Sequence, residues 1–337
     1  MHNGNILYHR KNLYTVEELF EGYNPEIQES YKTTLDWRIS LENQSDHEEE
    51  AIKAESLKPK DLVRSSKKQK LKKYFHDYFL DVEIKKYLES LQALPHEGCH
   101  GLIGIMGGHA VPRSSELYFE VAKTARQLTR EKYLVVTGGG PGVMEAANLG
   151  AWLAPLDDSA LPEAIKDITL PRANNNQEQF LLQEAWNLRL QTLSSYEKHQ
   201  RRSLAIPTWH YPHELTNVFA TSIAKFFNNA HRETVLLSIC EQGIIFFEGS
   251  VATVQEVFDA AAQNHHYTTR KKRPLILFNK EYWNPKPNIH GDYPEKTKPV
   301  WPLLLKIAQD THFENQVTLL SSCEEAIDTV KKIASYR

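Results

Sequence analysis

Residues 133–152 carry the pattern that decides the fold: YLVVTGGGPGVMEAANLGAW. An apolar run ends in four glycines within five positions, and a helical pattern follows at once. Glycine permits positive φ and close approach of a ligand to the backbone, while a helix N-terminus presents free N–H groups and the positive end of its dipole. This unit therefore predicts a phosphate cradle. Its spacing matches neither G-x-G-x-x-G nor G-x-x-x-x-G-K-[ST], so it indicates neither a dinucleotide fingerprint nor a P-loop.

Short apolar runs alternate with helical stretches on both sides of this unit. We expect strands at 102–108, 133–140, 204–207, 244–247, 274–278 and 316–320, and helices at 114–128, 142–152, 251–263, 300–309 and 324–335. Uniformly apolar strands that are each followed by a helix indicate a parallel sheet covered on both faces. The sequence thus predicts an α/β protein with a Rossmann-like, doubly wound parallel sheet. In such sheets the ligand lies beyond the carboxyl ends of the strands.

The composition is that of a globular protein and excludes several other classes. With 41% hydrophobic and 25% charged residues, the 337-residue chain is neither disordered nor collagen-like. Forty Lys and Arg against forty-three Asp and Glu give a net charge of −3, so no global field recruits nucleic acid or an anionic membrane. No apolar run is long enough to span a membrane, and the start lacks the apolar core of a signal peptide. Cys99, Cys240 and Cys323 lack metal spacing and predict reduced thiols in a cytoplasmic protein.

The sequence pattern of the first 99 residues differs from that of the rest of the chain. We expect a mainly helical N-terminal extension at 1–99 before an α/β domain at 100–337. An acidic patch at 42–50 and a basic run at 58–73 are interpreted as a solvated linker or helix face, with a polyanion contact as the alternative. Apolar residues at helical spacing over 74–91 predict an amphipathic helix that docks on the following domain. The insertion at 153–203 is too long for an ordinary connection and could form a lid, an oligomer contact or a surface helix.

Two further strand ends carry candidate ligand-binding residues. Gly107, Gly108 and His109 follow the first strand, where His109 could contact a phosphate or a ribose or serve a structural role. The run EGSVATVQE (248–256) lies between an apolar strand and a helix, so Ser250 and Thr253 could cap that helix or bind an oxyanion. The two histidines of TWHYPHE (208–214) have no evident third ligand, and we expect no metal site. Trp209 in the same run is expected to pack rather than to stack on a base.

Three runs together resemble a known family: IGIMGGHA (103–110), LYFEVAKTARQL (117–128) and YLVVTGGGPGVMEAANLGA (133–151). They are similar to the opening of the Lonely-guy (LOG) phosphoribohydrolases, and most similar to their longer relatives, the bacterial pyrimidine/purine nucleotide 5′-monophosphate nucleosidases. The run GIIFFEGSVATVQE (243–256) falls where the family carries P-G-G-x-G-T-x-x-E after a strand. The segment 317–333 also resembles the closing strand and helix of the family domain, so the resemblance covers about residues 100–337.

The resemblance implies a dimer-based Rossmann-like fold, as a homodimer or higher homo-oligomer. It implies hydrolysis of the N-glycosidic bond of a nucleoside 5′-monophosphate to free base and ribose 5-phosphate, with no metal and no cofactor. Glu256 would stabilise charge on the ribose, and Arg232 would serve the departing base, one residue before the family's usual position at Glu233. The candidate substrate- and phosphate-binding residues are Gly107, Gly108, His109, Thr137, Gly138, Gly139, Gly140, Gly142, Met144, Glu145, Gly249, Ser250 and Thr253.

The second glycine signature departs from the family pattern at three positions. Glu248 stands in place of proline, and Ser250 and Ala252 stand in place of glycines. A carboxylate at 248 would repel a phosphate unless it points away or finds a cation, and an alanine would strain the loop if the backbone needs positive φ there. Two other functions therefore stay open beside the hydrolase: a nucleotide-binding sensor that has lost hydrolysis, and an oligomeric scaffold with a vestigial pocket.

Overall fold

A parallel seven-stranded sheet forms the centre of the molecule in the computed structural model, which describes residues 10–44, 59–93, 98–169, 177–193, 198–211, 214–266 and 272–335. The strand order is β4-β3-β2-β1-β5-β6-β7. The strands are β1 (Gly101–Met106), β2 (Tyr133–Thr137), β3 (Ser203–Ala205), β4 (Ser222–Ile223), β5 (Gly243–Phe246), β6 (Leu275–Phe278) and β7 (Val317–Leu320). The predicted Rossmann-like, doubly wound sheet is confirmed.

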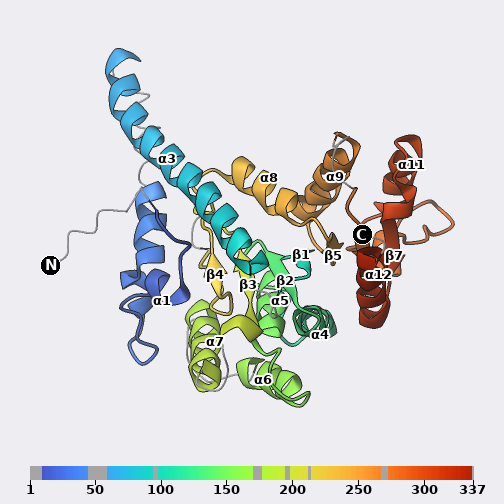
Figure 1. The fold of residues 1–337 in the computed structure, drawn as a ribbon, viewed down its shortest axis with the longest axis horizontal. Coiled ribbons are helices and arrows are strands. Elements are labelled where there is room, and N and C mark those ends of the chain that lie inside the picture. Colours follow the sequence, from blue (N-terminus) through green and yellow to red (C-terminus); the bar gives the residue numbers. More distant parts are fainter. Residues whose placement is uncertain are drawn as a thin grey trace.

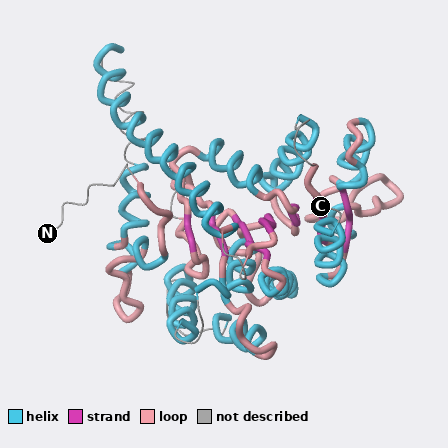
Figure 2. Tube along the Cα trace, viewed as in Figure 1, coloured by secondary structure: helices cyan, strands magenta, loops and turns pink. Residues whose placement is uncertain are grey.

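Helices cover both faces of this sheet (Figure 2). Figure 1 shows α3, α8 and α9 on one side and α4 to α7 on the other. Their bounds are α3 (Pro59–Gln92), α4 (Glu116–Arg130), α5 (Val143–Trp152), α6 (Ala160–Thr169), α7 (Gln177–Thr192), α8 (Asn229–Ile239), α9 (Val251–His266), α11 (Trp301–Asp310) and α12 (Cys323–Ser335). Short helices are α1 (Val16–Leu19), η1 (Ser30–Thr33), η3 (Lys198–Arg201), α10 (Lys280–Trp283) and η4 (Glu314–Gln316). None of the helices in the described ranges is both long and apolar enough to span a bilayer.

The direction of strand addition reverses at β1, which lies between β2 and β5. From β1 the chain adds β2, β3 and β4 toward one edge and then returns to add β5, β6 and β7 toward the other. The loops after β1 and β5 diverge at such a switch point and leave a crevice at the carboxyl edge of the sheet. The glycine loops found in the sequence follow β1, β2 and β5, so the topology gathers them at this crevice.

Some elements of the fold differ from the sequence prediction. β1 and β2 end at Met106 and Thr137, so the glycines that follow them belong to loops rather than to the strands. The two-residue β4 was not predicted, because a strand this short has no readable periodicity. Within the insertion at 153–203 the structure places α6, α7 and η3, where the sequence indicated one helical stretch.

The N-terminal region is mainly helical, as predicted, and packs onto the sheet. Tyr14 pairs with Ile223 of β4 through two backbone hydrogen bonds of 2.8 and 3.0 Å. The carboxylate of Asp77 in α3 accepts the amides of Phe227 and Asn228, at 3.0 and 2.9 Å, just before α8. These contacts hold the N-terminal region against the β4 edge. Its separation as a domain at 1–99 remains a prediction.

The expected amphipathic helix at 74–91 forms the second half of α3, but its faces differ in part from the prediction. Leu80, Ile84 and Leu91 are buried, whereas Tyr74 and Tyr78 are exposed, as is Phe75. The docked face therefore begins later along the helix than the apolar pattern suggested. Residues 59–73 of the basic run lie in α3 rather than in a linker, and much of the acidic patch at 42–50 lies outside the described residues.

Candidate functional site

A cavity of about 650 Å³ opens at the carboxyl edge of the sheet, above the switch point. The loops after β1, β2, β3 and β5 line it, together with α7 and the segment around η1. Twelve of the predicted site residues share its wall: Gly107, Gly108, His109, Gly138, Gly139, Gly140, Met144, Glu145, Arg232, Ser250, Thr253 and Glu256. Residues that lie more than 140 positions apart in the sequence thus meet in one cavity.

Three predicted residues, Thr137, Gly142 and Gly249, lie behind this wall rather than on it, and they shape the loops. Gly142 has a φ of 66°, and a Cβ there would collide with the carbonyl oxygens of Gly108 and His109. The amide of Val143 donates to Gly108 O at 3.0 Å, so the first two glycine loops are in direct contact. The hydroxyl of Thr137 accepts the amide of Gly139 at 3.1 Å. Glycine at 142 is required because two backbones meet there.

Asn217, from the loop between β3 and β4, lines the cavity and holds the glycine loop. Its amide donates to Gly139 O at 2.9 Å, and its side-chain Nδ2 donates to Gly140 O at 3.0 Å. Asn148 of α5 donates to Asn217 Oδ1 at 3.1 Å. Two carbonyl oxygens of the glycine loop are therefore turned toward Asn217. Asn217 was not predicted from the sequence, because a lone asparagine in a loop matches no motif.

Glu145, in the first turn of α5, is fully engaged by neighbouring side chains. Arg113 donates to both carboxylate oxygens, at 2.6 and 2.8 Å, and Tyr118 Oη donates to Oε1 at 2.7 Å. Arg113 also lines the cavity and was not among the predicted residues. The buried pair of Arg113 and Glu145 fixes α5 against the loop after β1. Glu145 therefore serves the cavity by holding Arg113 in its wall.

The altered signature after β5 is accommodated without strain or repulsion. Glu248 Oε1 accepts a 2.6 Å hydrogen bond from Asn279 Nδ2, in the loop after β6, and Glu248 does not line the cavity. Ala252 lies inside α9 and is not among the described residues with positive φ. Gly249 lies so close to Thr253 Oγ1 that a side chain at 249 would collide with it. Of the departures from the family pattern, neither Glu248 nor Ala252 obstructs the start of α9.

Arg232 and Glu256 face the same cavity from α8 and α9. Arg232 is 8% exposed; its Nη2 donates to Asn229 Oδ1 at 2.8 Å, while its buried Nε has no hydrogen-bond partner in the described part of the chain. Burial raises the pKa of Glu256 to about 7, against the opposing charge of Arg232, and Glu233 and Asp259 add to the rise. A buried cation with an unused donor and a carboxyl group that is half ionised near neutrality therefore lie in one wall.

Glu233, at the family's usual arginine position, also reaches the cavity. Its carboxylate accepts hydrogen bonds from Asn229 at 2.8 Å and from Gln255 at 3.1 Å. Asn229 therefore contacts both Arg232 and Glu233 at the start of α8. Through these two contacts Asn229 fixes the positions of the Arg232 guanidinium and the Glu233 carboxylate.

Comparison with known proteins adds no family assignment: no family model matches the chain, and no curated protein matches its sequence. Among solved structures, it is similar to the molybdenum cofactor binding protein from Rippkaea orientalis, at 16% identity over 69% of this chain and 96% of that one, with a TM-score of 0.41. It is also similar to the Moco carrier protein from Chlamydomonas reinhardtii, at 15% identity over 70% and 99%, with a TM-score of 0.42. At such values these likenesses carry no argument about substrate or reaction.

The other sequence predictions concern metal and packing. In the ranges that the structure describes, no three His, Cys, Asp or Glu side chains gather as a metal site would require. One of the two histidines at 208–214, His213, lies outside those ranges. Trp209 is 1% exposed and packs against Tyr14 and Phe227, as predicted.

Proposed function

We propose that this chain is a LOG-type phosphoribohydrolase whose cavity binds a nucleoside 5′-monophosphate and hydrolyses its N-glycosidic bond. The observation that carries the proposal is the meeting of Glu256, Arg232 and the glycine loop in one wall of the cavity. The sequence resemblance supports the choice of substrate, and the geometry supports the placement of the groups that the reaction requires. As in the resembling family, we propose a homodimer or larger homo-oligomer, which light scattering on the purified protein measures.

The phosphate would bind between the starts of α5 and α9. Both helices begin at the cavity, and helix N-termini favour anions through free N–H groups and the dipole. Ser250 and Thr253 offer hydroxyls at the start of α9. The guanidinium of Arg232 supplies a positive charge on the same wall. Binding the phosphate in a fixed place orients the ribose for reaction.

The sugar would lie beside Glu256. In hydrolysis the bond from C1′ to the base nitrogen breaks, its electron pair leaves with the base, and positive charge develops on C1′ and the ring oxygen. A carboxylate beside the ribose stabilises that charge and orients the hydroxyls. Water then adds to C1′ and loses a proton, and the base nitrogen gains one, so the products are free base and ribose 5-phosphate. A pKa near 7 allows Glu256 to hold or release a proton at neutral pH.

The test is release of free base from a panel of purine and pyrimidine 5′-monophosphates, measured by chromatography. Wild type is compared with Glu256→Gln, and with Glu314→Gln as a matched control on an exposed residue far along the chain. We expect release by wild type and control, and a loss of about 10²-fold or more in Glu256→Gln. Binding of a monophosphate without release in any of the three proteins would overturn hydrolysis in favour of the sensor. Absence of both binding and release would overturn the nucleotide site itself.

A further inference from the structure

The cavity has a second, apolar end that the sequence motifs did not include. Tyr31 and Trp37 of the N-terminal region line this end, together with Leu181, Leu182 and Ala185 of α7. The N-terminal region and α7 are neighbours, because Phe20 packs against Trp186 at 5.6 Å between ring centroids. Both lie on the side of β3 and β4, whereas Ser250, Thr253 and Glu256 follow β5 across the sheet.

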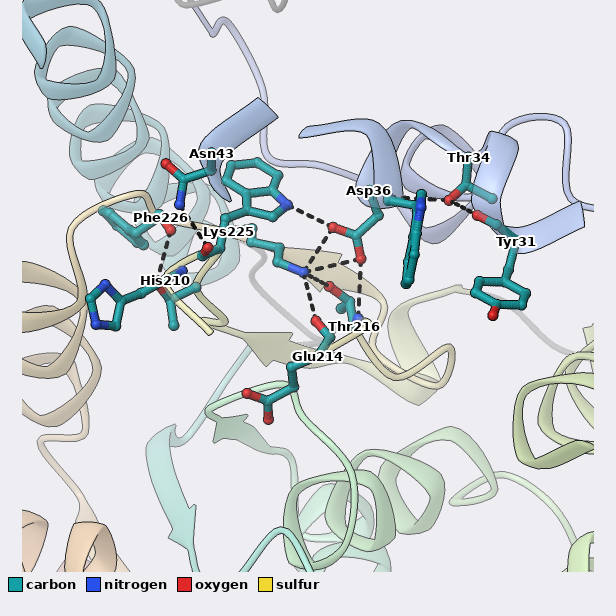
Figure 3. Close-up of polar contacts among 12 residues, drawn as sticks. Tyr31, Thr34, Asp36, Asn43, His210, Glu214, Thr216, Lys225 and Phe226 are labelled. Atoms are coloured by element: carbon teal, nitrogen blue, oxygen red, sulfur yellow. Dashed lines mark hydrogen bonds and ion pairs between the residues drawn. The ribbon is translucent and has the colours of Figure 1, made fainter. Parts of the chain in front are cut away.

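Thr34 fixes the two aromatic residues relative to each other. Its Oγ1 donates to Tyr31 O at 2.7 Å and accepts the amide of Trp37 at 3.3 Å; Figure 3 shows the contact between Thr34 and Tyr31. The rings are 5.1 Å apart at their centroids and nearly perpendicular, at 88°. Tyr31 is 6% exposed and Trp37 is 9% exposed, so each ring is packed in place and presents only an edge or part of a face to the cavity.

A buried ion pair holds this segment to the cavity wall. Lys225 Nζ contacts the two carboxylate oxygens of Asp36 at 2.8 and 3.1 Å, and both side chains are at most 1% exposed (Figure 3). Asp36 also accepts the amide of Thr216 at 3.1 Å, and Lys225 donates to Thr216 Oγ1 at 3.1 Å and to Glu214 O at 3.3 Å. Because both carboxylate oxygens of Asp36 and the ammonium of Lys225 have hydrogen-bond partners, the pair fixes one geometry. Glu214 and Thr216 themselves line the cavity.

The same loop continues into the phosphate end. Asn217 follows Thr216 and binds the carbonyl oxygens of Gly139 and Gly140. A continuous set of hydrogen bonds therefore connects Asp36, one residue before Trp37, with the glycine loop. The aromatic end and the phosphate end are held at a fixed separation before any ligand arrives. Preorganisation of this kind reduces the entropic cost of binding an extended, rigid ligand.

We propose that Tyr31 and Trp37 form the subsite for the planar base, so that the N-terminal region completes the ligand site. The inference rests on the proposed nucleotide ligand for its choice of base, but not on hydrolysis. Aromatic side chains take nucleobases through stacking and edge contacts that are tolerant of base identity. The apolar side chains of α7 would exclude water from the other side of the ring. The subsite thus favours a ligand that carries both a phosphate and a flat, uncharged ring over a sugar phosphate alone.

The test compares two ligands that differ only in the base. Affinity is measured by calorimetry for adenosine 5′-monophosphate and for ribose 5-phosphate, in full-length protein carrying Glu256→Gln to prevent turnover. Trp37→Leu removes the aromatic ring but keeps an apolar side chain, Trp37→Phe keeps a ring, and Tyr74→Ala removes an exposed aromatic of α3 as the matched control. Thermal unfolding is recorded for each variant.

We expect Trp37→Leu to weaken binding of the monophosphate about tenfold while ribose 5-phosphate affinity changes less than twofold. Trp37→Phe should retain most of the monophosphate affinity, and Tyr74→Ala all of it. An unchanged monophosphate affinity in Trp37→Leu, or an equal loss for both ligands, overturns the subsite. If Trp37→Leu proves unstable in thermal unfolding, the ratio of the two affinities in Tyr31→Leu decides in the same way.

These outcomes separate the subsite from the proposed reaction. Monophosphate binding that depends on Trp37, in a protein that releases no base when Glu256 is intact, supports the subsite and overturns hydrolysis. Base release whose KM is unchanged by Trp37→Leu supports hydrolysis and overturns the subsite. Failure of the parent protein to bind either ligand overturns both.

Discussion

Removing the negative charge of Asp36 should strongly destabilise the protein. The carboxylate lies in a fully buried pair with Lys225 and accepts three different donors: the Lys225 ammonium, the Trp209 Nε1 at 2.7 Å and the Thr216 amide. In Asp36→Asn the side-chain oxygen still accepts one of these donors, but the ammonium remains buried with only Thr216 Oγ1 and Glu214 O as acceptors. Breaking a buried pair on one side costs about 3–5 kcal/mol, since the remaining charge is uncompensated. We expect a loss near the lower bound, about 3 kcal/mol, because those two acceptors persist.

The stabilities of Asp36 and Lys225 variants should be coupled, with a definite sign. Lys225→Met removes the stranded charge and places an apolar side chain of similar length against Trp209, whose ring lies 5.5 Å from Lys225 Nζ. The double variant Asp36→Asn/Lys225→Met should therefore be more stable than Asp36→Asn alone, by about 1–3 kcal/mol. Urea unfolding followed by tryptophan fluorescence measures each free energy of unfolding, and Trp209 reports directly on the cluster.

An exposed pair supplies the control. Lys306 and Asp310 are 2.5 Å apart on α11, with side chains 66% and 56% exposed. Asp310→Asn should cost no more than about 0.5 kcal/mol. A loss below 1 kcal/mol in Asp36→Asn, or additive losses in the double variant, would refute the view that the buried pair fixes the N-terminal region.

Three further predictions concern the cavity. Burial raises the pKa of Glu256 to about 7, so base release should rise with pH through that value if the carboxylate is the active form, and Glu256→Gln should show a flat residual profile. The raised pKa of Glu256 makes a contribution to stability that is fully present below the ordinary carboxyl pKa and is lost as pH rises through about 7. The stability of Glu256→Gln relative to wild type should therefore be greater at pH 8 than at pH 5, as measured by unfolding at the two pH values. Gly142→Ala should cost about 3 kcal/mol or more and abolish phosphate binding, because the collision with two carbonyl oxygens adds to the strain of positive φ. Gly291→Ala, also at positive φ (86°) but in open space, should cost about 1 kcal/mol, and equal losses would contradict the close approach at 142. Asn217→Ala should weaken binding of inorganic phosphate by up to about tenfold, because Gly140 O loses the side-chain Nδ2 donor, while the backbone amide of residue 217 still donates to Gly139 O; calorimetry with unchanged affinity would exclude that role.

The sheet and its glycine loops were predictable because their signals are local. An apolar run, a glycine cluster and a helical period each occupy a few consecutive residues, and the order of these elements limits the topology. The apolar end of the cavity was not predictable in this way. Asp36 and Lys225 are 189 positions apart, and nothing in either neighbourhood indicates that one needs the other. Asn217 was missed for the same reason, since its function lies in two carbonyl oxygens 77 and 78 positions earlier.

The altered signature after β5 shows that a residue type alone does not decide whether a site survives. Glu248 in place of proline raises the expectation of charge repulsion, and that expectation follows correctly from Coulomb's law if the carboxylate faces the ligand. The side chain instead binds Asn279 at 2.6 Å, while its backbone oxygen accepts the amide of Gly108 at 2.8 Å. The substituted residue thus joins the first glycine loop to the third through its main chain and keeps its charge outside the cavity. This departure from the motif places no charge in the cavity, because Asn279 binds the new side chain.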